Sequence, residues 1–254
     1  MIYNKFVDLN FYKFIFRISK LDKYQILAIV FAIILLLIII VFTSRTRIIK
    51  TYNKYMKIGN KVNITGKELA FLSKRNLELD NLEFALTDRK LGDAYSPKYH
   101  TLILSEEVCN TASLASLTIV SHELGHAVQH KNATPLYVLT QLVKSLTNLT
   151  NKLIIPTLVI GLFLYLLKVP NENVGYILLI ISLSLFLLHI LELIIIIPLE
   201  YDASRRALKY LKEYNYVTPS EYRKAKKLLG VAAQTYIAGL FDDLLLLNKK
   251  RKKR

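Results

Sequence analysis

Two histidines and a glutamate near the middle of the chain have the types and the spacing that a zinc hydrolase needs. His122 and His126 lie four residues apart, and Glu123 follows the first of them. On a helix this spacing places both imidazoles on one face, one turn apart, so that both can bind a single zinc ion. Glu123 is then close enough to act as a general base toward water that zinc activates, without being a ligand itself.

The alternative is a solvated helix that carries two surface histidines. The chain contains only five histidines, and two of them have this spacing with a glutamate directly after the first, so the metal site is favoured. His130 extends the series by four more residues, but it lies two turns from His122. It is therefore expected near the site or on the surface, and not among the ligands.

Composition places this motif in a membrane protein. Of the 254 residues, 53% are hydrophobic, the mean hydropathy is +0.32, and the apolar residues form long runs. The net charge of +16 suits contact with anionic lipid, because the basic residues gather beside those runs. No stacking or groove-reading motif supports nucleic-acid binding. A single cysteine, Cys109, excludes an internal disulfide and disfavours the secreted disulfide-rich class.

Three apolar runs are predicted to be transmembrane helices. The first, 26–43, leads into basic residues without a small-residue cleavage site, so it is predicted to be an anchor and not a cleaved signal peptide. The runs at 153–167 and 174–199 are separated by a short connector and are predicted to form a helical hairpin. Because a hairpin crosses the bilayer and returns, the segments before and after it must face the same side.

This parity supplies a candidate for the third zinc ligand. Glu200 follows the hairpin and returns to the side of the membrane on which the histidines lie. Glu192 and His189 compete with it, since ionisable residues inside a span are functional candidates. However, they lie about 12 and 16 Å deeper along a helix and are expected to pair with each other. In the other interpretation of Glu200, its carboxylate ends a helix and pairs with Arg205 or Arg206.

The polar domain between the anchor and the hairpin is predicted to contain helices and short strands. A strand is expected near 82–86, where Leu82, Phe84 and Leu86 alternate with Glu83 and Ala85, and a second strand is expected at 101–105. The other expected features are a capping-box helix start at Thr65–Glu68, a turn or loop at 92–97, and Asn110 or Thr111 as the cap of the histidine-bearing helix.

Several segments together resemble one known family. They include Leu86-Thr87-Asp88, Tyr95-Ser96-Pro97, Leu104-Ser105-Glu106, the motif from His122 to Ala127, the run from Pro198 to Ala207, and Thr235-Tyr236. In this combination the chain is similar to the neutral zinc metallopeptidase family typified by YugP, which is related to the HtpX-type membrane gluzincins. The resemblance extends over most of the chain.

The resemblance implies a zincin-like fold and a role for each motif residue. It implies that His122, His126 and Glu200 are ligands of one zinc ion per chain, and that Glu123 is the catalytic acid and base. It further implies that an edge strand, expected at 101–105, pairs with an extended substrate.

The chain departs from the HtpX-type pattern after the third ligand. That pattern is Glu-x-x-x-Asp, whereas Ser204 stands here at the Asp position and Asp202 lies two residues after the glutamate, which puts a supporting role for Asp202 in doubt. The candidate oxyanion partners, each with a structural role as the alternative, are Tyr95, Tyr99, His100 and Tyr236.

The C-terminal part is predicted to begin with a helix. Thr218–Glu221 forms a second capping box with proline at the first helical position. The apolar run 228–241 is either a fourth span or, since it is short, a helix packed at the membrane edge. Basic residues flank the spans on the domain side, and the hairpin connector offers only Lys168, so the domain is expected in the cytoplasm. The basic N-terminal tail favours the opposite orientation.

The sequence thus predicts a mainly α membrane protein whose zincin-like domain has a few short strands, an N-terminal anchor, and a hairpin inserted before the third ligand. The expected function is zinc-dependent endopeptidase activity at the cell membrane, in a multi-pass protein. The expected partners are the lipid bilayer and a peptide or protein substrate, membrane proteins among the candidates. The alternative function is a non-catalytic zinc-binding membrane scaffold or quality-control adaptor.

The predicted segments are a basic tail (1–25), the anchor (26–43), the metallopeptidase domain (44–152), the hairpin (153–199), the third-ligand segment with the C-terminal helix (200–248) and a basic tail (249–254).

Overall fold

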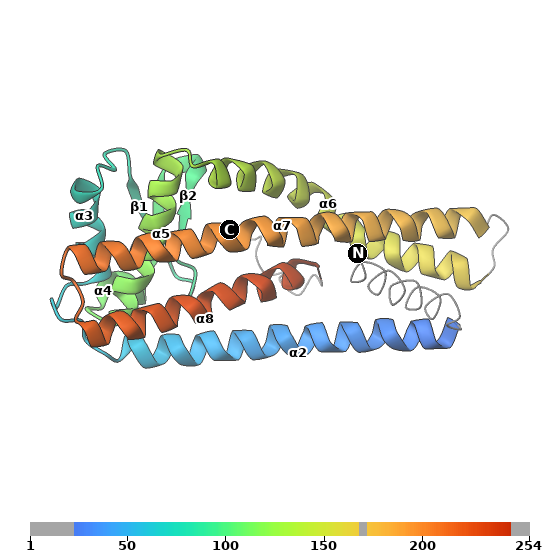
Figure 1. Ribbon diagram of the computed structural model, residues 1–254, viewed down its shortest axis with the longest axis horizontal. Coiled ribbons are helices and arrows are strands. Elements are labelled where there is room, and N and C mark those ends of the chain that lie inside the picture. The colour runs from blue at the N-terminus through green and yellow to red at the C-terminus, as the bar shows by residue number, and fades with distance from the viewer. Residues whose placement is uncertain (1–22, 168–171, 245–254) are drawn as a thin grey trace, which may run out of the picture.

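The computed structural model describes residues 23–167 and 172–244 and is mainly helical, with one small sheet (Figure 1). The predicted basic tails, except for three residues of the first, and residues 168–171 of the hairpin connector lie outside the described residues. The elements are α2 (Lys23–Met56), α3 (Gly66–Asn76), β1 (Glu83–Thr87), β2 (Ala94–Ser96), the short helix η1 (Pro97–Tyr99), β3 (Thr101–Ser105), α4 (Glu106–Asn110), α5 (Leu114–Lys131), α6 (Pro135–Leu166), α7 (Glu172–Glu213) and α8 (Pro219–Leu244).

The molecule is elongated, with two unlike ends. The sheet, α3, α4 and α5 lie together at one end, and α2, α6, α7 and α8 run from there along the long axis (Figure 1). The core at the domain end is built from buried apolar residues of α2, α3, β3, α4, α5, the second half of α7 and α8. The prediction of a mainly helical chain with a few short strands is confirmed.

The sheet has three strands in the order β1-β3-β2. β3 pairs in parallel with β1 and antiparallel with β2, so it is hydrogen-bonded on both sides. The prediction that the strand at 101–105 pairs with a substrate is therefore wrong, because that strand is not an edge. The predicted loop at 92–97 in fact contains β2, which is too short at three residues to show an alternating pattern.

Helix α5, which carries the histidine motif, is capped by Ser113. The Ser113 side chain accepts a hydrogen bond from the Ser116 N–H at 3.0 Å. The predicted caps were wrong, because Asn110 ends the separate short helix α4 and Thr111 is extended. Both predicted capping boxes, at Thr65–Glu68 and Thr218–Glu221, are confirmed by their reciprocal hydrogen bonds.

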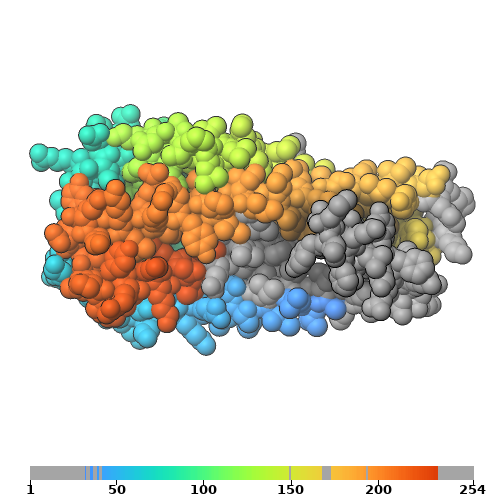
Figure 2. Space-filling model, viewed as in Figure 1, coloured from blue at the N-terminus to red at the C-terminus, as the bar shows by residue number. Residues whose placement is uncertain are grey.

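Helices α6 and α7 pack along each other in opposite directions. The Ser182 hydroxyl donates to the Ile154 carbonyl at 3.0 Å, and near the far ends a Cβ added at Gly161 would lie 3.1 Å from the Gly175 carbonyl. Pro198 does not interrupt α7, which is 42 residues long. The predicted boundary at 199 thus falls inside one helix, and the space-filling view shows α7 as a continuous band along this face (Figure 2).

Among the described residues, α7 is long and apolar enough to cross a membrane, and α6 becomes a second such helix if its two segments, bent by 40°, count as one span. Only 24% of the most apolar window of α7 is buried, whereas the core helix of a soluble protein would be mostly covered. At 42 residues, α7 is about 63 Å long, twice the thickness of a hydrocarbon core. The anchor at 26–43 stays a prediction, because most of its side chains lie outside the described residues.

Candidate metal centre

The site forms where α5 crosses α7. A Cβ added at Gly125 would lie 2.7 Å from the Ala203 carbonyl oxygen, so only glycine permits this approach of the two backbones. Ala203 and Ala207 of α7 are fully buried at the same contact. Small residues on both helices therefore bring the histidine face of α5 against the Glu200 turn of α7.

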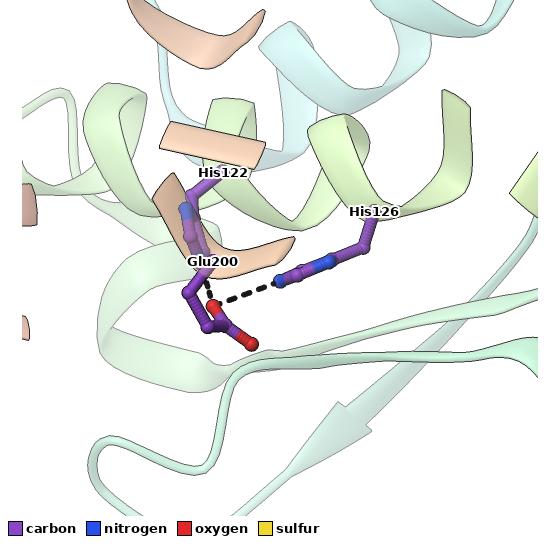
Figure 3. A group of neighbouring side chains, drawn as sticks. All are labelled: His122, His126 and Glu200. Carbon is purple, nitrogen blue, oxygen red and sulfur yellow. Dashed lines mark hydrogen bonds and ion pairs between the residues drawn. The ribbon is translucent and has the colours of Figure 1, made fainter. Parts of the chain in front are cut away.

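Three of the predicted site residues meet at this crossing. Glu200 Oε2 lies 3.2 Å from the Nε2 atoms of both His122 and His126 (Figure 3). One ligand atom from each residue lies within 4.8 Å of the others, and among the described residues this is the only group of three that could hold a metal ion. The histidines project from adjacent turns of one helix, and the glutamate comes from 74 residues further along the chain.

The donor set and its spacing fit zinc. Two imidazole nitrogens and one carboxylate oxygen, with a fourth position open, are the ligands of catalytic zinc sites. With zinc–ligand bonds of about 2.0–2.1 Å, tetrahedral ligand atoms lie roughly 3.4 Å apart. The two nitrogen–oxygen distances of 3.2 Å already match that separation.

Burial and neighbouring charges determine protonation at the site. Burial raises the pKa of Glu123, whose carboxylate accepts a hydrogen bond from the Tyr95 N–H at 2.9 Å. Burial alone would lower the pKa of His126, but the Glu200 carboxylate outweighs it and raises that pKa to about 9. The Glu200 carboxylate therefore stabilises a positive charge on the His126 ring.

The second ring nitrogen of each histidine also has a partner. His126 Nδ1 lies 2.9 Å from Gln129 Oε1, and His122 Nδ1 lies 3.3 Å from the Ser204 hydroxyl. Sequence reasoning missed Gln129, although its position three residues after His126 places it one turn further along the same helix face. Asp202 contacts neither histidine directly but accepts a hydrogen bond from Gln129 Nε2 at 2.9 Å.

Comparison with known proteins identifies the chain. A sequence model of the family described as "Putative neutral zinc metallopeptidase" matches residues 29–250. This chain belongs to that family. It is also 27% identical over 209 residues, 81% of its length and 88% of the relative's, to a Bacillus subtilis (strain 168) protein named "Putative membrane protease YugP". No solved structure matches the chain.

The family and the relative's name together indicate a zinc-dependent protease associated with a membrane, in agreement with the long, exposed apolar part of α7.

Two residues compete with Glu200 as the third ligand of this metallopeptidase. They are His189 and Glu192, which are neighbours on α7. His189 Nδ1 and Glu192 Oε2 lie 3.2 Å apart, which confirms that they pair with each other.

Glu200 pairs with the two histidines and not with an arginine, as the alternative interpretation expected. Arg205 and Arg206 both donate to Asp202 instead, at 2.5 and 2.6 Å. The Glu200 carboxylate therefore contacts both motif histidines, while the neighbouring carboxylate of Asp202 takes the two cations.

Two of the four candidate oxyanion groups, Tyr95 and His100, contact His130. The Tyr95 hydroxyl lies 2.7 Å from His130 Nδ1, and the His100 ring stacks on the His130 ring at 4.8 Å. Tyr99 is 63% exposed, and the Tyr236 side chain lies outside the described residues. His130 itself is near the site and outside the group of three. These contacts agree with the structural alternative for Tyr95 and His100.

Proposed function

We propose that this metallopeptidase is a membrane-embedded zinc endopeptidase whose ligands are His122, His126 and Glu200. The observation that carries the proposal is the meeting of these three side chains at the α5–α7 crossing, with Glu123 in the same helical turn. Zinc, when bound there, supplies a Lewis acid that polarises a carbonyl oxygen and makes water more acidic.

Glu123 moves the protons of the reaction. Its carboxylate accepts a proton from the water whose oxygen bonds to the peptide carbonyl carbon. When the carbon–nitrogen bond breaks, Glu123 returns that proton to the departing amine. The Tyr95 N–H holds Glu123 Oε2 at 2.9 Å, which keeps this carboxylate beside the β2 backbone.

We assign the pairing with substrate to strand β2, because β3, for which it was expected, lies inside the sheet. Strand β2 lies at the edge of the sheet, and the Tyr95 N–H points away from β3 toward Glu123. An extended peptide can add to such an edge through main-chain hydrogen bonds. The peptide bond to be cleaved would then lie next to Glu123.

A cavity beside Glu123 suits an apolar side chain of the substrate. It has a volume of about 180 Å³, and its lining includes His122, Glu123 and mainly apolar side chains of α2, α5 and α8. The apolar lining residues are Ile48, Tyr52, Leu91, Ile119, Leu228, Leu229 and Ala232, and Asp93 is the remaining polar one. Peptides with an apolar residue next to the cleaved bond are therefore the proposed substrates, and membrane-protein segments are rich in such residues.

The proposed membrane topology is multi-pass. The anchor at 26–43 and the hairpin of α6 with the first part of α7 cross the bilayer, and the second part of α7 lies in the domain. Basic residues flank the domain side of these helices, so the catalytic domain faces the cytoplasm. Glu200 would then lie just outside the lipid.

The substitution Glu123→Gln tests the proposal. In detergent-solubilised or nanodisc-embedded protein it is expected to retain zinc and to lose at least about 100-fold of cleavage of an unfolded protein or peptide library, because the amide cannot accept the proton. Glu213→Gln, an exposed carboxylate substitution on α7, serves as the matched control and should cleave normally. Proteolysis at wild-type rate in Glu123→Gln would contradict the mechanism and favour a zinc-binding scaffold without turnover.

A further inference from the structure

Gln129 of α5 is fully buried and joins the metal site to α7. Its Oε1 atom lies 2.9 Å from His126 Nδ1. Its Nε2 atom donates to the Leu199 carbonyl at 3.0 Å and to Asp202 Oδ2 at 2.9 Å. A carboxamide has two N–H donors and one carbonyl oxygen, so this side chain uses every hydrogen-bonding group that it has.

These partners determine which way the amide points. A main-chain carbonyl and a carboxylate only accept hydrogen bonds, so the NH₂ group of Gln129 must face Leu199 and Asp202. The carbonyl oxygen must then face His126, and Nδ1 of that ring must carry the proton. In the neutral imidazole, the lone pair is left on Nε2, the atom that lies 3.2 Å from Glu200 Oε2.

Asp202 accepts the hydrogen bond at the Nε2 end of Gln129, on the side away from His126. Arg205 and Arg206 each donate to one of its oxygens, so the carboxylate keeps its charge and its position. His122 has no comparable support, because its Nδ1 faces the Ser204 hydroxyl at 3.3 Å, and a hydroxyl can either donate or accept. The two histidines are therefore held in unequal ways.

We propose that Gln129 is a positioning residue that holds His126 in the Nδ1–H form, with Asp202 anchoring the amide. The chain departs from Glu-x-x-x-Asp at Ser204, and Asp202 supplies the supporting carboxylate indirectly, through Gln129. The inference rests on the proposed zinc site but not on peptidase activity.

Zinc affinity measured by competition with a chelator is the first readout, on folded, monodisperse protein. Gln129→Met keeps the length of the side chain and removes its hydrogen bonds, and it is expected to weaken zinc binding by about 10–100-fold. Ser204→Ala is the matched comparison and should cost less than Gln129→Met. Wild-type affinity in Gln129→Met, or a larger loss in Ser204→Ala, would overturn the proposal.

A double-mutant cycle separates positioning from mere packing. If Asp202 acts on His126 through Gln129, Asp202→Ala should weaken zinc binding in the wild-type background but add little in Gln129→Met, because the amide that Asp202 anchors is already gone. Nitrogen NMR of labelled histidine rings in the zinc-loaded protein should show the proton on His126 Nδ1 in the wild type. Simple addition of the two losses, or a proton on Nε2, would contradict the role of Gln129. Failure of the wild type to bind zinc would instead contradict the proposed function.

Discussion

Helix α7 contributes to two buried groupings of histidine and glutamate, and they differ in how many elements build them. At the α5–α7 crossing, Glu200 meets two histidines from another helix. Deeper in the hairpin, His189 and Glu192 are three residues apart on α7 itself and lie 3.2 Å from each other. The exposed fractions of His189 and Glu192 are 0% and 4%, and those of His122 and Glu200 are 7% and 6%.

The difference shows that burial of ionisable groups does not by itself make a metal site. Ionisable residues inside a span are functional candidates by default, yet a local pair supplies only two ligand atoms. The crossing supplies three, and Gln129, Ser204 and Tyr95 contact the polar atoms around it. Convergence of separate elements, supported by outer hydrogen bonds, distinguishes the candidate metal centre from the His189–Glu192 pair.

The largest expected effect comes from removing the third ligand. Glu200→Ala should weaken zinc binding by more than about 100-fold, because it deletes a ligand and not merely a supporting group. Metal analysis of the purified protein, followed by chelator competition, measures this. Full zinc occupancy in Glu200→Ala would move the third-ligand role to Glu192 or Asp202.

Glu192→Ala is the matched substitution in the other grouping. It should leave zinc affinity unchanged and lower the free energy of unfolding by about 1 kcal/mol, since it breaks one buried polar contact within α7. Thermal unfolding in detergent measures the stability change. Loss of zinc in this variant would erase the distinction between the two groupings.

A smaller effect is expected from a substitution that disturbs the close approach of α5 and α7. Gly125→Ala places a Cβ 2.7 Å from the Ala203 carbonyl oxygen, so the backbones must separate. The expected cost is about 1–3 kcal/mol of unfolding free energy, together with weaker zinc binding, because the histidines move away from Glu200.

Gly230→Ala provides the control for this substitution. Gly230 is also inside a helix, but a Cβ there would meet none of the described atoms within 4 Å. Alanine is expected to stabilise that helix by about 0.5–1 kcal/mol, since glycine is the more flexible residue. Equal effects of the two substitutions on stability and zinc binding would show that the crossing does not require glycine.

The features that could be predicted from the sequence follow from local spacing. His122 and His126 share a face because helical periodicity dictates it, and the capping box at Thr65–Glu68 depends on residues three apart. Glu200 could be chosen as a ligand candidate only because the hairpin argument limited which carboxylates return to the histidines' side.

The features that could not be predicted depend on contacts between distant segments. Gln129 has a role only because α7 places Leu199 and Asp202 beside it. The position of β3 inside the sheet depends on β2, a strand of three residues within a segment that has turn-forming Gly92 and Pro97 at its ends. The sequence predicts that the third apolar run ends at 199, but α7 continues past this position and packs against α5 there.

X-ray absorption spectroscopy of the zinc-loaded wild-type protein tests the central claim most directly, because it reports the atoms bound to the metal. The predicted result is one zinc per chain with nitrogen and oxygen ligands only, including two imidazoles, at about 2.0–2.1 Å. A sulfur ligand, which only the buried Cys109 or the two methionines could provide, or a third imidazole in place of the carboxylate, would contradict the site formed by His122, His126 and Glu200.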